Sequence, residues 1–249
     1  MKTVLDFAPE VSKWLVDDWF PLGHRVMDAA PEGSFKTMLG CWFAVCIATG
    51  SPIFGHGVTQ GAVLIVDEET PSASLDNHLE RFCQGVNAKF NDLPIYRMSM
   101  TGFRFGRKTA MQELMKWVDL LKPTFIRLDS LLAMLPSGRF GVSENDSHLG
   151  EIIRDDLTAI INVNPNCTIL LSAHAKKFVA DLTFDDIKDR EMQAIVRGHS
   201  SIVGEGCDTG IIIKKISEYP KPTRFSIFTR VRRHAIPASK MRVIELVEE

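Results

Sequence analysis

The chain has 249 residues, of which 45% are hydrophobic and 24% are charged, and its formal net charge at pH 7 is −2. This length and composition predict one soluble domain over residues 1–249 with a sizeable core. The small net charge excludes a global attraction to nucleic acid or to anionic membranes, so any such binding must come from local patches.

The five cysteines are scattered and include no C-x-x-C pair. They predict reduced thiols in a cytoplasmic protein, and neither a disulfide framework nor a zinc site. The N-terminal segment carries acidic residues and no continuous apolar stretch, so no signal peptide is expected. The apolar run at residues 38–47 is too short to cross a bilayer, and no membrane association is expected.

Apolar runs alternate with helical patterns along the first two thirds of the chain. The patterns predict strands and helices in the order 24–30, 37–49 (helix), 61–69, 72–84 (helix), 93–100, 109–122 (helix), 124–130, 148–163 (helix) and 167–174. Gly50 is well placed to end the first helix. Such alternation predicts an α/β fold with a mainly parallel sheet flanked by helices.

The pattern changes after residue 174. Residues 175–208 form a polar, irregular stretch, and three strand-like segments follow at 209–216, 223–233 and 241–248. Their short connections predict antiparallel C-terminal strands that extend one edge of the sheet.

Residues 29–40, AAPEGSFKTMLG, place a Lys-Thr pair between a turn-rich segment and a predicted helix. A phosphate-binding loop needs this order, because helix N-terminal amides, a lysine and a Mg²⁺-binding hydroxyl act together on the phosphates. Ala30 and Phe35 replace the two glycines of the usual pattern G-x-x-x-x-G-K-[ST]. A bulky residue with positive φ at position 35 would cost about 1–2 kcal/mol. This stretch alone leaves a nucleotide site and a solvated Lys-Thr pair equally open.

Polar side chains follow three of the later predicted strands. These are Asp67-Glu68-Glu69, Asp129-Ser130 and His174. Each alone is commonly a solvated or structural group. Because parallel strands bind ligands beyond their carboxyl ends, the three sets together favour a nucleotide site at that edge of the sheet.

Several segments resemble the RecA-like ATPases of the plasmid RepA type, which are relatives of the DnaB-type hexameric replicative helicases. The matching pieces follow the family's order over roughly residues 14–235 and include GHRVMDAAPEGSFKTMLG, VLIVDEETPSASLDNHLERF, TFIRLDSLLAML, SENDSHLGEI, TILLSAHAKK and VRGHSSIVG. That family accepts S-[FY]-K-[ST] in its phosphate loop. The resemblance therefore implies a RecA-like fold and a site for ATP and Mg²⁺.

The resemblance also implies roles for individual residues. The nucleotide would be bound by Ala30, Pro31, Glu32, Gly33, Ser34, Phe35, Lys36, Thr37 and Asp129, with Thr37 and Asp129 holding Mg²⁺. Glu69 would polarise the attacking water, with Glu68 as the alternative. His174 would sense the γ-phosphate. Arg127, which interrupts the apolar strand before Asp129, has no role in this scheme.

Hydrolysis in that family is completed by an arginine from a neighbouring subunit. Arg233 is the first candidate, Arg230 the second, and Arg197 a competitor. A basic strand edge that blocks unwanted pairing is the alternative interpretation of Arg230 and Arg233.

The resemblance places single-stranded DNA at two loops, residues 136–147 and 175–200. Their basic candidates are Arg139, Lys176, Lys177 and Lys188. The second loop also carries five carboxylates, which make a poor surface for a polyanion, so its contact with DNA stays open.

The sequence thus predicts an ATP-hydrolysing motor that acts on single-stranded DNA. The resemblance to RepA and DnaB-type helicases implies that this motor is a hexamer. A separate primase or loader is an expected partner. Two alternatives stay open: a RecA- or RadA-like recombination or regulatory ATPase, and a nucleotide-gated binding module that hydrolyses poorly.

Overall fold

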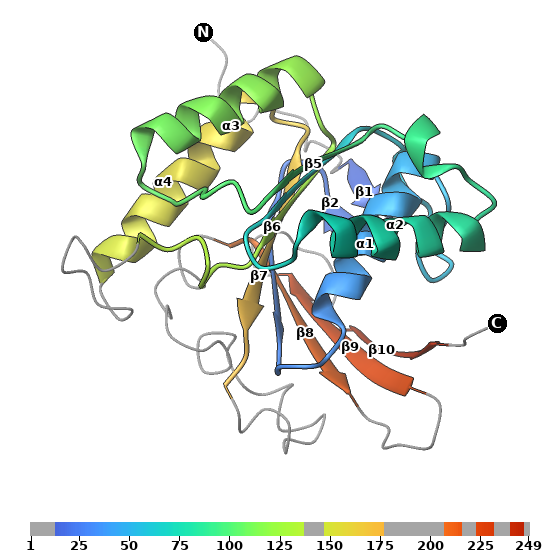
Figure 1. Cartoon of the computed structure of the whole chain (residues 1–249). Coiled ribbons are helices and arrows are strands. Elements are labelled where there is room, and N and C mark those ends of the chain that lie inside the picture. Colours follow the sequence, from blue (N-terminus) through green and yellow to red (C-terminus); the bar gives the residue numbers. More distant parts are fainter. Residues whose placement is uncertain (1–12, 137–146, 177–206, 216–222, 232–239, 247–249) are drawn as a thin grey trace, which may run out of the picture.

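The computed structural model describes residues 13–136, 147–176, 207–215, 223–231 and 240–246. An eight-stranded sheet has the order β10-β9-β8-β3-β7-β6-β4-β5 (Figure 1). Its strands are β3 (Arg25–Ala30), β4 (Val63–Asp67), β5 (Ile95–Ser99), β6 (Phe125–Asp129), β7 (Thr168–His174), β8 (Thr209–Lys215), β9 (Thr223–Val231) and β10 (Lys240–Leu246). A separate two-stranded sheet joins β1 (Trp14–Val16) to β2 (Phe20–Pro21).

Six neighbouring strands, from β8 to β5, run parallel, which confirms the predicted mainly parallel sheet. The antiparallel extension is confirmed for β9 and β10. β8 is antiparallel to β9 and joins the rest of the sheet through a parallel pairing with β3. β8 lies on the opposite side of β3 from β7, so the chain must cross over to reach it as a parallel strand. The connection of residues 175–208 is long enough for such a crossover.

Helices cover both faces of the sheet. Figure 1 shows α1 (Lys36–Thr49) and α2 (Ser72–Gly85) on one face, with α3 (Lys108–Leu121) and α4 (Ser147–Val163) on the other. A short 3₁₀ turn, η2 (Phe90–Asp92), precedes β5. Gly50 ends α1 with φ 77°, as predicted, because this left-handed position carries no steric cost for glycine.

Alternate residues of each strand enter two separate cores, as the period of two requires. Met27 and Ala29 of β3 pack in the core under α3 and α4, whereas Val26 and Ala30 pack in the core under α1 and α2. Asp28 lies between these residues in the strand and so faces the α1 side. This placement puts a buried carboxylate next to the helix that carries the Lys-Thr pair.

Across the described part of the chain, no helix combines the length and the apolar character needed to cross a membrane.

Candidate active site

The loop between β3 and α1 contains two residues with positive φ. Gly33 has φ 75° and Phe35 has φ 58° and ψ 20°, so both adopt the left-handed conformation. The Ser34 N–H donates to the Pro31 carbonyl oxygen at 3.3 Å, and the Leu39 N–H donates to the Phe35 carbonyl oxygen at 2.9 Å. The Phe35 side chain packs against the core under α1, and this contact offsets the cost of its positive φ.

Helix α1 begins at Lys36, directly after this loop. Its first backbone N–H groups have no partner within the helix and carry the positive end of the helix dipole, which favours an anion. The Lys36 side chain is buried, and its Nζ donates to the Ala173 carbonyl oxygen in β7 at 3.4 Å. The lysine therefore lies over the ends of the central strands, where a phosphate at the helix N-terminus would meet it.

Thr37 and Asp129 meet as a pair. The Thr37 hydroxyl donates to Asp129 Oδ2 at 3.0 Å, although 92 positions separate the two residues. The other carboxylate oxygen of Asp129 is buried and has no hydrogen-bond partner among the described residues. A hydroxyl beside a buried carboxylate with a free oxygen fits Mg²⁺, which takes one or two protein ligands and completes its shell with water and phosphate.

Within the described ranges, no group of three or more His, Cys, Asp or Glu side chains could hold a metal ion. The donor set at Thr37 and Asp129 thus suits a metal that arrives with a nucleotide.

Glu69 faces the site beside His174. The His174 Nε2 atom lies 3.3 Å from Glu69 Oε1, within hydrogen-bond distance. This contact is the largest cause that holds the pKa of Glu69 below its ordinary value, although burial opposes it. An ionised, partly accessible carboxylate at this place can polarise a water molecule.

Glu68 has a different environment and is almost fully buried. Its carboxylate accepts hydrogen bonds from the Thr101 N–H and hydroxyl, the Gly102 N–H, the Phe103 N–H and the Arg104 guanidinium. Burial opposes ionisation, but these donors outweigh it and lower the pKa of Glu68. Glu68 therefore anchors the loop after β5, and of the two glutamates named as alternatives it is Glu69 whose carboxylate lies beside His174.

A row of polar side chains crosses the sheet beneath these residues. In the strand register, Asp28 of β3 lies opposite Ser172 of β7, and Asp67 of β4 lies opposite Asp129 of β6. Burial raises the pKa of Asp28 to about 6, while Lys36 opposes the shift. Burial also raises the pKa of Asp67, and Arg127 opposes that shift.

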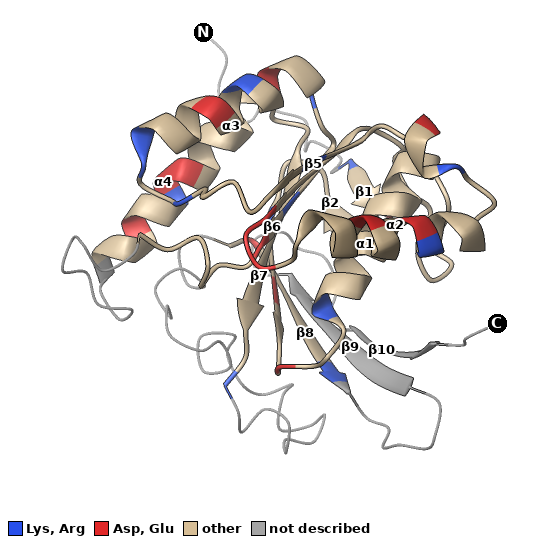
Figure 2. Cartoon of the chain, in the orientation of Figure 1, with Lys and Arg blue, Asp and Glu red and all other residues tan. Residues whose placement is uncertain are grey.

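Sequence reasoning named Asp67 only as one of three carboxylates at a strand end, and it gave no role to Asp28 or Arg127. For Asp28 and Arg127 the available signal was a charged residue inside an otherwise apolar strand. Figure 2 shows the acidic turn after β4 at the centre of the molecule, between the two helix layers.

Several predicted residues lie outside the described residues. They are Arg233, Arg197, Arg139, Lys177, Lys188 and the two proposed DNA loops except for positions 136, 147, 175 and 176. Arg230 lies in β9, where its backbone pairs with Gly210 of β8. The roles of these residues stay predictions.

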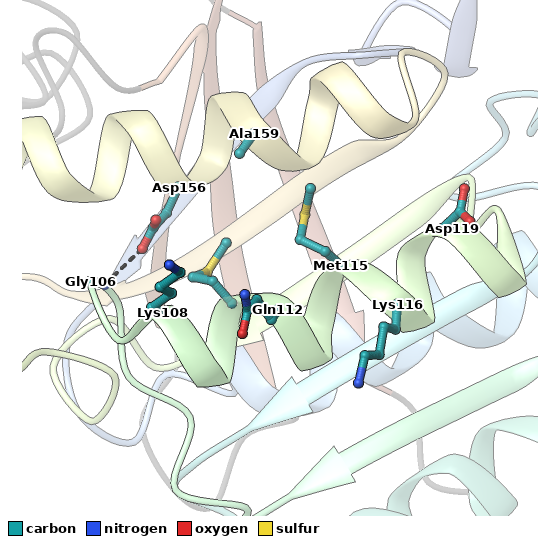
Figure 3. A pocket seen from close by; sticks show the side chains of 9 residues that line it. Gly106, Lys108, Gln112, Met115, Lys116, Asp119, Asp156 and Ala159 are labelled. Atoms are coloured by element: carbon teal, nitrogen blue, oxygen red, sulfur yellow. Dashed lines mark hydrogen bonds between the residues drawn. The ribbon is translucent and has the colours of Figure 1, made fainter.

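A surface groove lies between α3 and α4, in the helix layer opposite α1 (Figure 3). Lys108, Met115, Lys116 and Asp156 are among the residues that line it. No residue of the Lys36 and Asp129 region contributes to the groove, so it is separate from the candidate active site.

Three comparisons with known proteins bear on this site. A family model described as an AAA domain matches residues 3–178. A comparison with curated proteins finds no match.

Solved structures with similar folds cover almost the whole chain. A KaiC-like protein from the hyperthermophilic archaeon Pyrococcus horikoshii OT3 superposes with a TM-score of 0.59, covering 94% of both chains at 14% identity. A RadB recombinase superposes with a TM-score of 0.60, covering 91% of this chain and 88% of that chain at 17% identity. These likenesses show the RecA-like fold, and with the family match they support an ATPase of the P-loop class.

Proposed function

The chain belongs to the AAA-domain family, and on that premise we propose that it is an ATP-hydrolysing motor acting on single-stranded DNA, similar to RepA and DnaB-type hexameric helicases. One arrangement of side chains supports the hydrolytic part of the proposal. The Thr37–Asp129 pair and the Glu69–His174 pair come from different elements, and the buried Lys36 at the start of α1 reaches the strand that ends in His174.

Each of these residues has a distinct task in hydrolysis. Lys36 and the amides of the loop would bind the β- and γ-phosphates, and Thr37 and Asp129 would hold Mg²⁺, which supplies charge neutralisation at the phosphates. Glu69 would orient and polarise the attacking water. His174, whose ring nitrogen lies within hydrogen-bond distance of Glu69, would respond when the γ-phosphate leaves.

The described site contains one cation for the phosphates, Lys36, and phosphoryl transfer in such enzymes uses a second one. We propose that Arg233 of a neighbouring subunit supplies it, with Arg230 and Arg197 as alternatives. Head-to-tail contacts of this kind close into a ring when the rotation permits, and six subunits follow from the resemblance. The loops at 136–147 and 175–200 would face single-stranded DNA.

A second candidate, a RecA- or RadA-like recombination or regulatory ATPase, has equal support. The RadB recombinase and the KaiC-like protein share the fold at low identity, and the fold alone does not choose between a ring and a filament. A third candidate is a nucleotide-gated binding module that hydrolyses slowly.

ATP turnover measured with and without single-stranded DNA tests the proposal. A motor is expected to hydrolyse ATP faster with single-stranded DNA and to displace a complementary strand. Stimulation without strand displacement, together with filaments in electron micrographs, would favour the recombinase candidate. Slow turnover that DNA leaves unchanged would favour the binding module and refute the motor.

A further inference from the structure

Arg127 is a fully buried cation directly beneath the candidate metal site. It stands in the middle of β6, and none of its side chain is exposed to solvent. Its guanidinium forms ion pairs with Asp129, through Nη2, and with Asp67, where Nη1 lies 3.6 Å from Oδ2. A buried charge is tolerated only when opposite charges neutralise it, so these contacts account for its presence in the core.

The helix above makes room for this side chain. Gly40 lies in α1 against the Arg127 guanidinium, and a methyl group added at position 40 would overlap the side chain. Glycine inside a helix is unfavourable relative to alanine. Its presence here is explained by the space that Arg127 occupies.

The two carboxylates that Arg127 contacts lead to two different parts of the site. Asp129 accepts the hydrogen bond from Thr37. Asp67 accepts hydrogen bonds through Oδ1 from the N–H groups of Glu69 at 2.9 Å and Thr70 at 2.7 Å, which fixes the turn that carries Glu69. One guanidinium therefore connects the metal carboxylate with the turn of the water-polarising glutamate.

The buried carboxylates around the site also need a counter-ion, and Arg127 supplies a positive charge. Asp67 and Asp129 are buried on the adjacent strands β4 and β6, Asp28 is buried on β3, which β7 separates from β6, and the buried cations near them are Arg127 and Lys36. Without Arg127, Asp67 and Asp129 would stand opposite each other, paired in register and without a counter-ion. Two adjacent carboxylates of this kind attract a divalent cation.

We propose that Arg127 is a positioning residue, which holds Asp129 in a fixed place relative to the turn that carries Glu69 and that Asp67 fixes. Arg127 also acts as the internal counter-ion of the buried carboxylates when no divalent cation is bound. The positioning part rests on the proposed ATPase function. The counter-ion part concerns this chain's own charges and does not.

Two substitutions separate charge from geometry. Arg127→Met removes the cation and keeps an unbranched apolar side chain of similar reach. Arg127→Lys keeps the charge but loses the planar fork that reaches both carboxylates. Arg25→Met is the matched control, because Arg25 pairs with Asp208 near the start of β3, at the opposite end of the strand from the site.

The first measurement is thermal unfolding of the full chain without nucleotide, in EDTA and in excess MgCl₂. For wild type, Arg127→Lys and Arg25→Met, the unfolding temperature of each protein is expected to be the same in EDTA as in MgCl₂. Arg127→Met is expected to unfold at a lower temperature than wild type in EDTA and to recover part of the loss in MgCl₂. An Arg127→Met protein that Mg²⁺ does not stabilise would overturn the counter-ion role.

The second measurement is steady-state ATP hydrolysis. Both Arg127 variants are expected to lose roughly 10²-fold in kcat, as misplaced catalytic groups do, with a smaller change in KM for ATP. Arg25→Met is expected to keep the wild-type kcat. If Arg127→Met does not fold, Arg127→Lys decides, and wild-type kcat in that variant would overturn the positioning role. A wild-type chain without ATPase activity refutes the proposed function, whereas the Mg²⁺-dependent unfolding still tests the counter-ion.

Discussion

Replacing Glu68 and Glu69 separately by glutamine distinguishes an anchoring carboxylate from a catalytic one. Glu68 Oε2 accepts hydrogen bonds from the Gly102 N–H at 2.9 Å and from Arg104 at 3.2 Å. In Glu68→Gln an NH₂ group takes the place of one carboxylate oxygen and cannot accept either bond. Hydrogen bonds to a charged group contribute about 1.5–3 kcal/mol each, and the partly exposed Arg104 contributes less.

We therefore expect Glu68→Gln to lower the free energy of unfolding by about 2–4 kcal/mol, which for a chain of this length lowers Tm by roughly 5–15 °C. Glu69→Gln loses one hydrogen bond at a partly exposed site, so its stability should change by less than about 1 kcal/mol. Its kcat for ATP hydrolysis should fall by roughly 10²–10⁴-fold, while Mg²⁺–ATP binding is kept.

Thermal unfolding and phosphate release, measured on both variants in parallel, provide the assay. The pKa of Glu68 is lower in the folded chain than its ordinary value. Its stabilisation is therefore present above the unfolded pKa and is lost as the pH falls through the folded pKa. The Tm gap between wild type and Glu68→Gln should be full at pH 7 and shrink below about pH 4. A Glu68→Gln protein that unfolds like wild type but cannot hydrolyse ATP would reverse the two assignments.

The other expected outcomes test the loop, the helix above Arg127 and the subunit contact. Lys36→Ala should lower kcat at least about 10³-fold, and turnover at the wild-type rate would refute the phosphate loop. Phe35→Gly should keep nucleotide binding, with stability within about 1 kcal/mol of wild type, since relief of the positive φ offsets the lost ring contact. Gly40→Ala should cost about 1–3 kcal/mol in denaturant unfolding, and less in an Arg127→Ala background, because the overlap is with the Arg127 side chain. Mixing Arg233→Ala with Lys36→Ala subunits should restore part of the ATPase activity, and a dead mixture that still co-assembles would refute the shared site.

Hydrophobic periodicity was sufficient to predict most elements of this fold. The strand VLIVD was predicted within 61–69 and is Val63–Asp67, because a run buried on both faces has few other placements. The parallel pairing of β8 with β3 was not predicted. Its TGIIIKK sequence is apolar on both faces and carries no mark of direction, so parallel and antiparallel pairing satisfy it equally.

The site was predictable to the extent that polar residues stand at strand ends. Lys36, Thr37, Asp129, Glu69 and His174 were named from their positions and from the resemblance. The fold brings Thr37 to Asp129 and Glu69 to His174, and Lys36 reaches the Ala173 carbonyl oxygen. The choice between Glu68 and Glu69 needed the structure. It depends on the loop at residues 101–104, which supplies the donors that hold Glu68 and which no local pattern links to that residue.

The buried charges beneath the site could not be assigned a role from the sequence. Asp28 in β3, Gly40 in α1 and Arg127 in β6 are each unfavourable choices for their own element, since burial penalises both charges and a helix interior penalises glycine. Contacts between the elements compensate for these costs. Gly40 leaves space for the Arg127 side chain, and the carboxylates of Asp67 and Asp129 neutralise its charge. Local rules are broken together where a protein maintains a site at the expense of stability. Three such departures around one guanidinium are therefore better explained by a requirement of the site than by three independent accidents of packing.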